Sequence, residues 1–110
     1  MMHASLDASP WVSRFAAAVP AGEVLDLACG SGRHARLFAS KGHPVLALDR
    51  DRQALALAAG PGITTLEIDL EGEGAGWPFA AGRFAGIVVT NYLHRPLFAD
   101  LVKSLAPNGV

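Results

Sequence analysis

Short apolar segments alternate with helix-like segments of about ten residues along most of this chain, and this alternation limits the fold most strongly. The apolar segments, each typical of a buried β-strand, are Glu23–Ala28, Pro44–Asp49, Ile63–Leu70 and Phe84–Thr90. The helix-like segments that follow them are 33–42, 52–60 and 95–105. Strands joined through helices pair in parallel, because the chain crosses over the sheet between them. We therefore predict an α/β fold, a Rossmann-like three-layer sandwich with a mostly parallel sheet.

A further helix is expected near the N-terminus. The Ser-Pro pair at 9–10 is a favourable helix start, because Ser caps the first turn and Pro fits the first helical position. Trp11, Phe15 and Val19 then recur at helical spacing until a proline ends the pattern. We expect this aromatic face to pack on the core, with a lid over a ligand site as the alternative. Residues 1–8 are expected to be a flexible end.

Length and composition place the chain among small globular domains. It has 110 residues, 51% of them hydrophobic, which is enough for one packed core. The net charge of −1 contains no long run of either sign, so a nucleic-acid partner is not expected. Cys29 is the only cysteine, which excludes an intrachain disulfide and a Cys-rich metal site and fits a reducing cytoplasm. No signal peptide or membrane span is predicted.

A glycine-rich turn follows the first predicted strand. Residues 30–35, GSGRHA, match the G-x-G-x-x-G/A pattern, and Asp49 lies about twenty residues further on. Gly30 and Gly32 would let a ligand approach the backbone closely, and Asp49 would accept hydrogen bonds from ribose hydroxyls. This pattern fits both a nicotinamide or flavin dinucleotide and another adenosine cofactor.

Asp26 separates these two cofactor classes. A carboxylate just behind the turn is unfavourable next to a diphosphate. S-adenosylmethionine (SAM) has no phosphate, and its amino-acid tail carries an ammonium group that Asp26 can balance directly or through water. Asp26 therefore favours SAM, although it could instead be a structural carboxylate that caps a neighbouring loop.

Polar residues stand at the carboxyl ends of the other three predicted strands, where open parallel sheets bind their ligands. These residues are Asp49, Asp69 and Asn91. The two aspartates could also end their strands simply because Asp favours turns. A shared ligand site at this edge of the sheet is the functional interpretation.

Residues 24–51, VLDLACGSGRHARLFASKGHPVLALDRD, resemble the first two motifs of the class I SAM-dependent methyltransferases. Ala28 stands where this family often has Gly. The segment IDLE at 68–71 is similar to the family's adenine-flanking region, which implies that Asp69 meets the exocyclic amine and Leu70 meets the ring. The segment 77–94 resembles the family's fourth-strand region, with Ala85 at a position that is usually Asp. The cofactor-binding residues implied by this resemblance are Asp26, Ala28, Cys29, Gly30, Gly32, Asp49, Arg50, Asp69, Leu70 and Asn91.

The resemblance implies fewer catalytic residues than cofactor-binding residues, and all of them are only candidates. Asn91, Tyr92 and His94 are candidates because this strand end faces the methyl group and the acceptor in the family. Cys29 is expected to be a buried filler and His34 to be packed rather than catalytic. Trp77 is expected to anchor its loop, with a cover over adenine as the alternative.

The function implied is transfer of the SAM methyl group to a small-molecule acceptor. The alternatives are a non-catalytic SAM-binding fragment and an NAD(P)-dependent oxidoreductase. The sequence reaches only about four strands, whereas the family continues through a fifth. We therefore expect residues 9–110 to be the N-terminal, SAM-binding part of a longer enzyme, or to self-associate through the exposed edge of the fourth strand.

Overall fold

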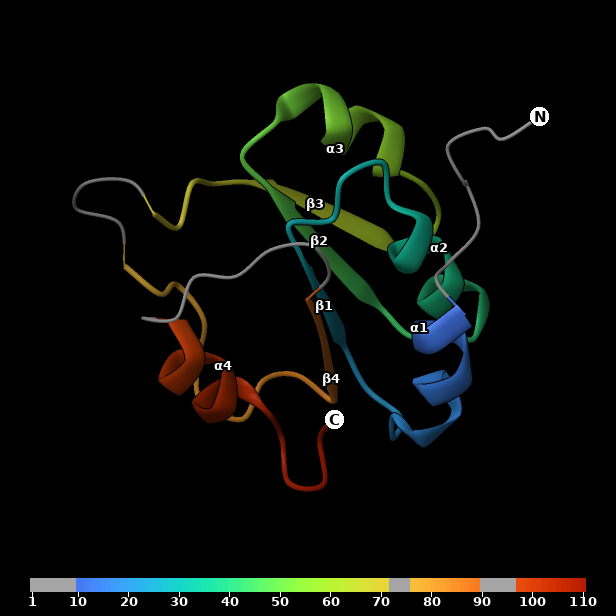
Figure 1. Ribbon diagram of the computed structural model, residues 1–110, viewed down its shortest axis with the longest axis vertical. Helices are drawn as coiled ribbons and strands as arrows, with labels where there is room; N and C mark the ends of the chain where they lie inside the picture. The colour runs from blue at the N-terminus through green and yellow to red at the C-terminus, as the bar shows by residue number, and fades with distance from the viewer. Residues whose placement is uncertain (1–9, 72–75, 90–96) are drawn as a thin grey trace.

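The computed structural model describes residues 10–71, 76–89 and 97–110, and its centre is a four-stranded sheet. The strands are β1 (Val24–Leu27), β2 (Val45–Asp49), β3 (Ile63–Glu67) and β4 (Gly86–Val89). They lie in the order β3-β2-β1-β4, and every neighbouring pair is parallel (Figure 1). Because all four point the same way, their carboxyl ends lie along a single edge.

Helices cover the sheet on both faces (Figure 1). They are α1 (Pro10–Phe15), the 3₁₀ turn η1 (Ala16–Ala18), α2 (Arg33–Ser40), α3 (Arg52–Ala58) and α4 (Phe98–Ser104). Residues from α1, η1, α2 and α3 share one buried cluster with the sheet, and residues around α4 share another on the opposite face. The predicted three-layer α/β fold is confirmed, and the sheet is parallel throughout the described residues.

The two clusters follow from the alternation of side chains along a strand. In β1, Val24 belongs to the cluster under α2, whereas Leu25 and Leu27 belong to the cluster on the α4 side. All four β1 side chains are buried, as expected for a central strand covered on both faces. Asp26 therefore lies on the α2 side of the sheet, in the middle of the molecule.

Strand ends differ from the predicted bounds because each strand continues only where its neighbour does. β3 ends at Glu67, three residues before the predicted end at Leu70, because Glu67 pairs with Asp49, the last residue of β2. β4 begins at Gly86 rather than Phe84, because Gly86 pairs with Val24, the first residue of β1. Register with the central strands, rather than local apolar composition, sets these lengths.

The aromatic face of the N-terminal helix was expected to pack on the core, and this expectation is wrong. Trp11 and Phe15 remain 65% and 43% exposed and contact each other with tilted rings, whose centroids are 4.5 Å apart. Val12 and Ala16, four residues apart, are buried instead, because their small side chains let the helix approach the sheet closely. The α-helix ends at Phe15 and continues as a 3₁₀ turn, so the predicted spacing through Val19 is not maintained.

The other helices begin where the sequence predicts, as far as the structure describes them. Asp51 caps α3, since its side chain accepts a hydrogen bond from the Gln53 N–H at 2.9 Å. α2 ends at Ser40, and Gly42 follows with the left-handed φ of 92° that suits a helix stop. The predicted start of the last helix at residue 95 lies outside the described residues, within which α4 begins at Phe98.

Candidate cofactor site

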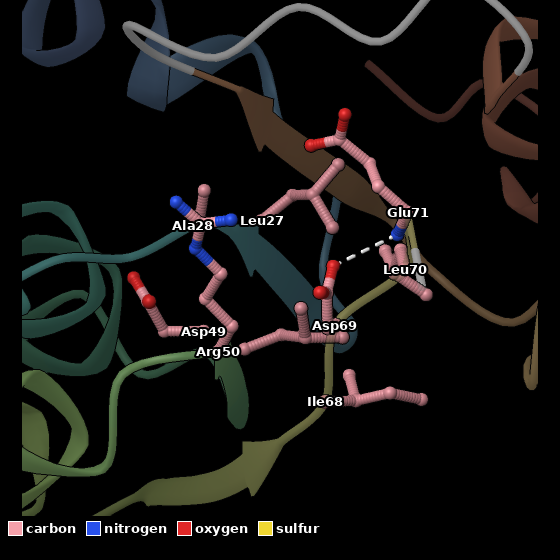
Figure 2. A pocket seen from close by; sticks show the side chains of 9 residues that line it. Leu27, Ala28, Asp49, Arg50, Ile68, Asp69, Leu70 and Glu71 are labelled. Carbon is pink, nitrogen blue, oxygen red and sulfur yellow. Dashed lines mark hydrogen bonds between the residues drawn. The ribbon is translucent and has the colours of Figure 1, made fainter. Parts of the chain in front are cut away.

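A pocket lies at the carboxyl edge of the sheet, between the ends of β1 and β2 and the segment after β3 (Figure 2). Its volume is about 160 Å³. The lining residues are Leu27, Ala28, Leu48, Asp49, Arg50, Ile68, Asp69, Leu70 and Glu71. Whole-ligand pockets usually enclose about 300–1,000 Å³, so this volume fits the nucleoside part of a larger cofactor.

The glycine turn between β1 and α2 has a backbone that strongly restricts its residues. Ala28, Gly30 and Gly32 have φ values of 56°, 57° and 89°, all in the left-handed region. A Cβ on Gly32 would lie 2.6 Å from the Cα of Ala58 in α3, so the turn packs directly on that helix. Ala28, at the position where the family often has Gly, adopts a conformation that favours Gly.

Arg36, which the sequence analysis did not select, also holds the glycine turn in place. The Arg36 Nη1 donates to the Ser31 carbonyl at 2.7 Å and to the Leu57 carbonyl at 3.3 Å. This side chain joins the glycine turn to the end of α3. No local motif marks it, because its partners come from two separate segments.

Asp49 binds the glycine turn itself. Its Oδ2 accepts the Gly30 N–H at 2.9 Å, and its Oδ1 accepts the Asp51 N–H at 2.9 Å. Each carboxylate oxygen has a second acceptor site, so a ribose hydroxyl can still donate to Asp49. The side chain is half-buried at the end of β2 and lines the pocket beside the exposed Arg50.

Two glycine N–H groups of the turn are therefore already occupied. Gly30 donates to Asp49, and Gly32 donates to the Cys29 carbonyl at 3.1 Å. The amino-acid tail of SAM also carries a carboxylate, for which the N–H groups of a turn at a helix start could serve as donors. While these two bonds hold, such a carboxylate would have to use other donors, and a diphosphate loses the same two donors.

The far wall of the pocket comes from the segment after β3. Asp69 is exposed, and its Oδ1 accepts the Glu71 N–H at 3.0 Å (Figure 2). Leu70 is 8% exposed and presents an apolar surface beside Ile68. Ile68 and Glu71 are lining residues that the sequence interpretation did not select, although both belong to the IDLE segment.

The pocket has an acidic lining. Asp49, Asp69 and Glu71 supply three carboxylates against the single guanidinium of Arg50. This excess of negative charge suits hydroxyl and amine donors of a nucleoside and opposes a diphosphate.

Asp26 is isolated more completely than the sequence suggests. It is 1% exposed, and neither carboxylate oxygen has a hydrogen-bond partner among the described residues. Burial raises its pKa from the usual 3.8 to about 7, and the negative charge of Asp49 adds to the shift. The Ala35 N–H and the Arg33 charge oppose it, although that N–H does not reach hydrogen-bond geometry. No described hydrogen bond supports the alternative of a loop cap.

Three further side chains have the structural roles that the sequence analysis favoured. Cys29 is 7% exposed, and burial followed by the charges of Asp26 and Asp49 raises the pKa of its thiol to about 12, so it is a buried filler. His34 is 2% exposed, and burial lowers its pKa. The Trp77 Nε1 donates to the Ser104 Oγ at 2.6 Å, which confirms that Trp77 anchors its loop, here on α4.

The predicted catalytic candidates Asn91, Tyr92 and His94 lie outside the described residues. Among the residues that are described, no three His, Cys, Asp or Glu side chains gather so that they would hold a metal ion. No helix in the described part of the chain is long and apolar enough to cross a membrane.

Comparisons with known proteins show the family to which the chain belongs. Residues 24–109 match the family described as a methyltransferase domain. No match was found among curated protein sequences. Because the family match spans most of the sequence, the chain belongs to the class I SAM-dependent methyltransferase-domain family.

Several solved structures share this fold. A SAM-dependent methyltransferase from Mesorhizobium loti is 28% identical, with 94% of this chain and 52% of that chain covered and a TM-score of 0.74. A SAM-dependent methyltransferase from Geobacter sulfurreducens, solved with S-adenosyl-L-homocysteine, is 18% identical, with 94% and 47% covered and a TM-score of 0.72. A geranyl diphosphate methyltransferase, solved with GPP and sinefungin, is 15% identical, with 90% and 41% covered and a TM-score of 0.70. The chain thus spans about half the length of these relatives.

Proposed function

We propose that this chain binds SAM at the pocket and takes part in transfer of its methyl group to a small-molecule acceptor in the cytoplasm. The observation that carries the proposal is the pair of carboxylates, Asp49 and Asp69, on opposite walls of a nucleoside-sized pocket. Asp49 would accept from the ribose hydroxyls, and Asp69 would accept from the exocyclic amine of adenine. Leu70 would contact the adenine ring.

SAM, when bound, supplies a methyl group on a positively charged sulfur that is already a good leaving group. The protein's own task is then to hold and orient the cofactor and to exclude water. Asp26 would balance the ammonium group of the amino-acid tail, because a buried carboxylate that lacks a hydrogen-bond partner in the described part of the chain gains most from a nearby cation. Asn91, Tyr92 and His94 stay candidates for contact with the acceptor.

A small-molecule acceptor is supported by charge and by one relative. The net charge of −1, without a long run of either sign, argues against a dedicated nucleic-acid surface. The geranyl diphosphate methyltransferase shows that this fold serves a small-molecule acceptor in that protein.

Of the two alternatives, the oxidoreductase has less support. A dinucleotide diphosphate needs free N–H groups at the glycine turn, whereas Gly30 and Gly32 donate within the chain. The other alternative is a non-catalytic SAM-binding role. Turnover separates that role from the proposed one.

Calorimetric titration with S-adenosylhomocysteine, NAD⁺ and NADP⁺ tests the cofactor. We expect binding of S-adenosylhomocysteine alone, weakened about tenfold or more by Asp69→Ala, because one charge-assisted hydrogen bond is lost. Glu67→Gln is the matched control, since Glu67 pairs with Arg52 on the surface and does not line the pocket. Binding of NAD⁺ or NADP⁺ without S-adenosylhomocysteine would overturn the proposal.

A second titration tests the role of Asp26. 5′-Methylthioadenosine carries the nucleoside but lacks the amino-acid tail. Asp26→Asn should therefore weaken S-adenosylhomocysteine severalfold and leave 5′-methylthioadenosine unchanged. Equal weakening of both ligands would show that Asp26 acts through the turn rather than on the ammonium group.

A further inference from the structure

The apolar wall of the cofactor pocket lies beyond the end of a strand, so the sheet holds this wall only in part. β3 ends at Glu67, and the Ile68 N–H still donates to the Asp49 carbonyl at 3.0 Å. Leu70 follows, lines the pocket and is 8% exposed (Figure 2). It belongs to the buried cluster on the α4 side of the sheet. The position of Leu70 therefore depends on the side chains that pack against this cluster.

Trp77 is one of these side chains, and two hydrogen bonds in series connect it to α4. Its Nε1 donates to the Ser104 Oγ at 2.6 Å, and the Ser104 Oγ donates to the Asp100 carbonyl at 2.9 Å. A hydroxyl has one proton, so Ser104 uses it on Asp100 and accepts from Trp77 with a lone pair. Because Ser104 is 1% exposed, loss of either partner would leave a polar group unpaired in the interior.

A row of aromatic contacts holds Trp77 from a second element. Its ring centroid lies 5.1 Å from that of Phe79, which lies 5.2 Å from that of Phe84, both in edge contact. Phe84 is fully buried just before β4. The Arg83 guanidinium lies over both phenylalanine rings, and it pairs with Glu23 at 3.0 Å. Trp77 is thus fixed both to α4 and to the residues that lead into β4.

We infer that Trp77 is a positioning residue for the adenine end of the cofactor pocket and that its hydrogen bond to Ser104 holds Leu70 and Ile68 in place. Trp77 itself does not line the pocket, so it acts through these two side chains rather than on the ligand. The inference rests on the proposed function, because it assigns the apolar wall to adenine. It goes beyond the anchoring of a loop, because it predicts an effect on affinity that is confined to one part of the ligand.

The test compares two ligands that differ at the base. S-adenosylhomocysteine carries adenine, whereas S-ribosylhomocysteine has the same ribose and amino-acid tail without a base. Trp77→Phe removes the donor and keeps an aromatic ring, and Ser104→Ala removes the acceptor. Each variant should weaken S-adenosylhomocysteine about fivefold in calorimetric titration, the effect of losing one hydrogen bond, and leave S-ribosylhomocysteine unchanged. The double variant should be no weaker than either single one, because both remove the same bond.

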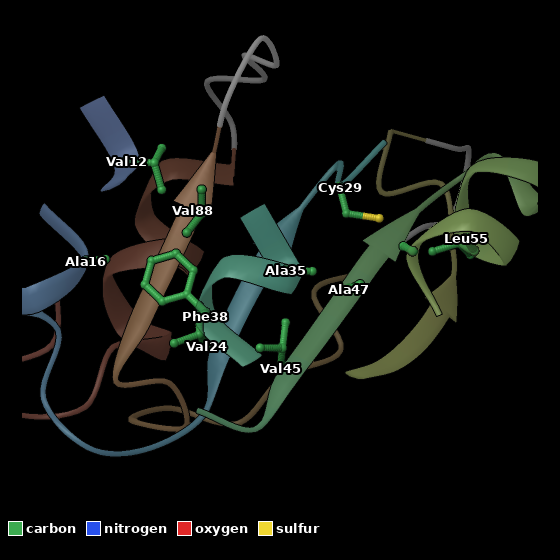
Figure 3. Close-up of a cluster of buried hydrophobic side chains, with 11 residues drawn as sticks. Val12, Ala16, Val24, Cys29, Ala35, Phe38, Val45, Ala47, Leu55 and Val88 are labelled. Atoms are coloured by element: carbon green, nitrogen blue, oxygen red, sulfur yellow. The ribbon is translucent and has the colours of Figure 1, made fainter. Parts of the chain in front are cut away.

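The matched control lies on the other face of the sheet. Val12 is buried in the cluster drawn in Figure 3, which contains none of the residues that line the cofactor pocket. Val12→Ala should lower stability through the cavity that it leaves, and should keep the affinity for both ligands. This control separates a loss of stability from a displaced pocket wall.

Tryptophan emission gives a readout that a purely structural Trp77 would not change. The chain has two tryptophans, so in a Trp11→Phe background the emission comes from Trp77 alone. The emission should change as S-adenosylhomocysteine binds, with the Kd found by calorimetry, because the indole and the pocket wall are packed together.

Three outcomes would overturn the inference: equal weakening of both ligands by Ser104→Ala, unchanged affinity in both single variants, or Trp77 emission that stays constant while calorimetry shows binding. Failure of the wild type to bind S-adenosylhomocysteine is a different result, and it would overturn the proposed function itself.

Discussion

Asp26 shows at the scale of one residue how strongly burial can change a side chain. The sequence indicates an acidic residue behind a glycine turn and predicts a ligand that tolerates it. The structure adds that the carboxylate is 1% exposed and has no hydrogen-bond partner among the described residues. Its isolation depends on α2 and β2, which lie next to it only in the folded chain.

The raised pKa of Asp26 predicts how stability depends on pH. In the unfolded chain the group ionises near 3.8, whereas in the folded chain it keeps its proton up to about pH 7. The folded state therefore binds more protons between these values, so its stability falls as pH rises from about 4 to 7 and then levels off. The difference corresponds to about 4 kcal/mol.

Asp26→Asn should remove this decline, and urea unfolding between pH 4 and 8 measures it. Asp100→Asn, on the partly exposed first turn of α4, is the matched control and should keep the wild-type slope. Parallel pH profiles for the wild type and Asp26→Asn would contradict the assignment.

The backbone conformation of Ala28 gives a second prediction about a single residue. Its φ of 56° is unfavourable for any residue with a Cβ and favourable for Gly. Ala28→Gly should therefore stabilise the chain by about 0.5–1 kcal/mol, after the greater freedom of Gly in the unfolded state is subtracted. Denaturant unfolding checks this value, with the helical Ala35→Gly as a control that should lose stability. A loss in Ala28→Gly would mean that its methyl group packs better than its backbone conformation suggests.

At the scale of elements, the contact between the glycine turn and α3 positions the cofactor site. Both glycines of the turn have a positive φ, but only Gly32 faces a neighbour, since a Cβ there would lie 2.6 Å from Ala58. A Cβ on Gly30 would meet nothing within 4 Å. The sequence pattern contains both glycines without distinguishing their roles, whereas the packing shows that only Gly32 needs to lack a side chain for steric reasons.

This difference predicts unequal effects of the same substitution. Gly32→Ala should cost about 3 kcal/mol or more, because it forces α3 away from the turn and adds backbone strain. Gly30→Ala should cost only the strain of a left-handed alanine, about 1–2 kcal/mol. Chemical denaturation of the two variants makes the comparison, and equal losses would show that α3 does not press on the turn.

At the scale of the whole molecule, the two faces of the sheet place aromatic residues differently. Phe84 is fully buried on the α4 side, where it makes edge contact with Phe79, whereas Trp11 is 65% exposed. Phe84→Ala should cost about 3–5 kcal/mol, because it leaves a cavity at the base of the α4 layer. Trp11→Ala should change stability by about 0.5 kcal/mol or less. Thermal unfolding distinguishes the two, and a large loss in Trp11→Ala would restore the expectation that its aromatic face is part of the core.

The sequence by itself determined the alternation of strands and helices, the glycine turn, the cap at Asp51, the acidic residue that ends the second strand and the one shortly after the third. Side-chain periodicity and turn chemistry act over a few neighbouring residues, so a single sequence contains them. Only the tertiary structure decided where β3 ends, where β4 begins, which face of α1 is buried, and that Asp49 holds Gly30. It also decided that Asp26 has no described partner and that Trp77 bonds to Ser104. These features depend on atoms from segments distant in the chain, which no local pattern specifies.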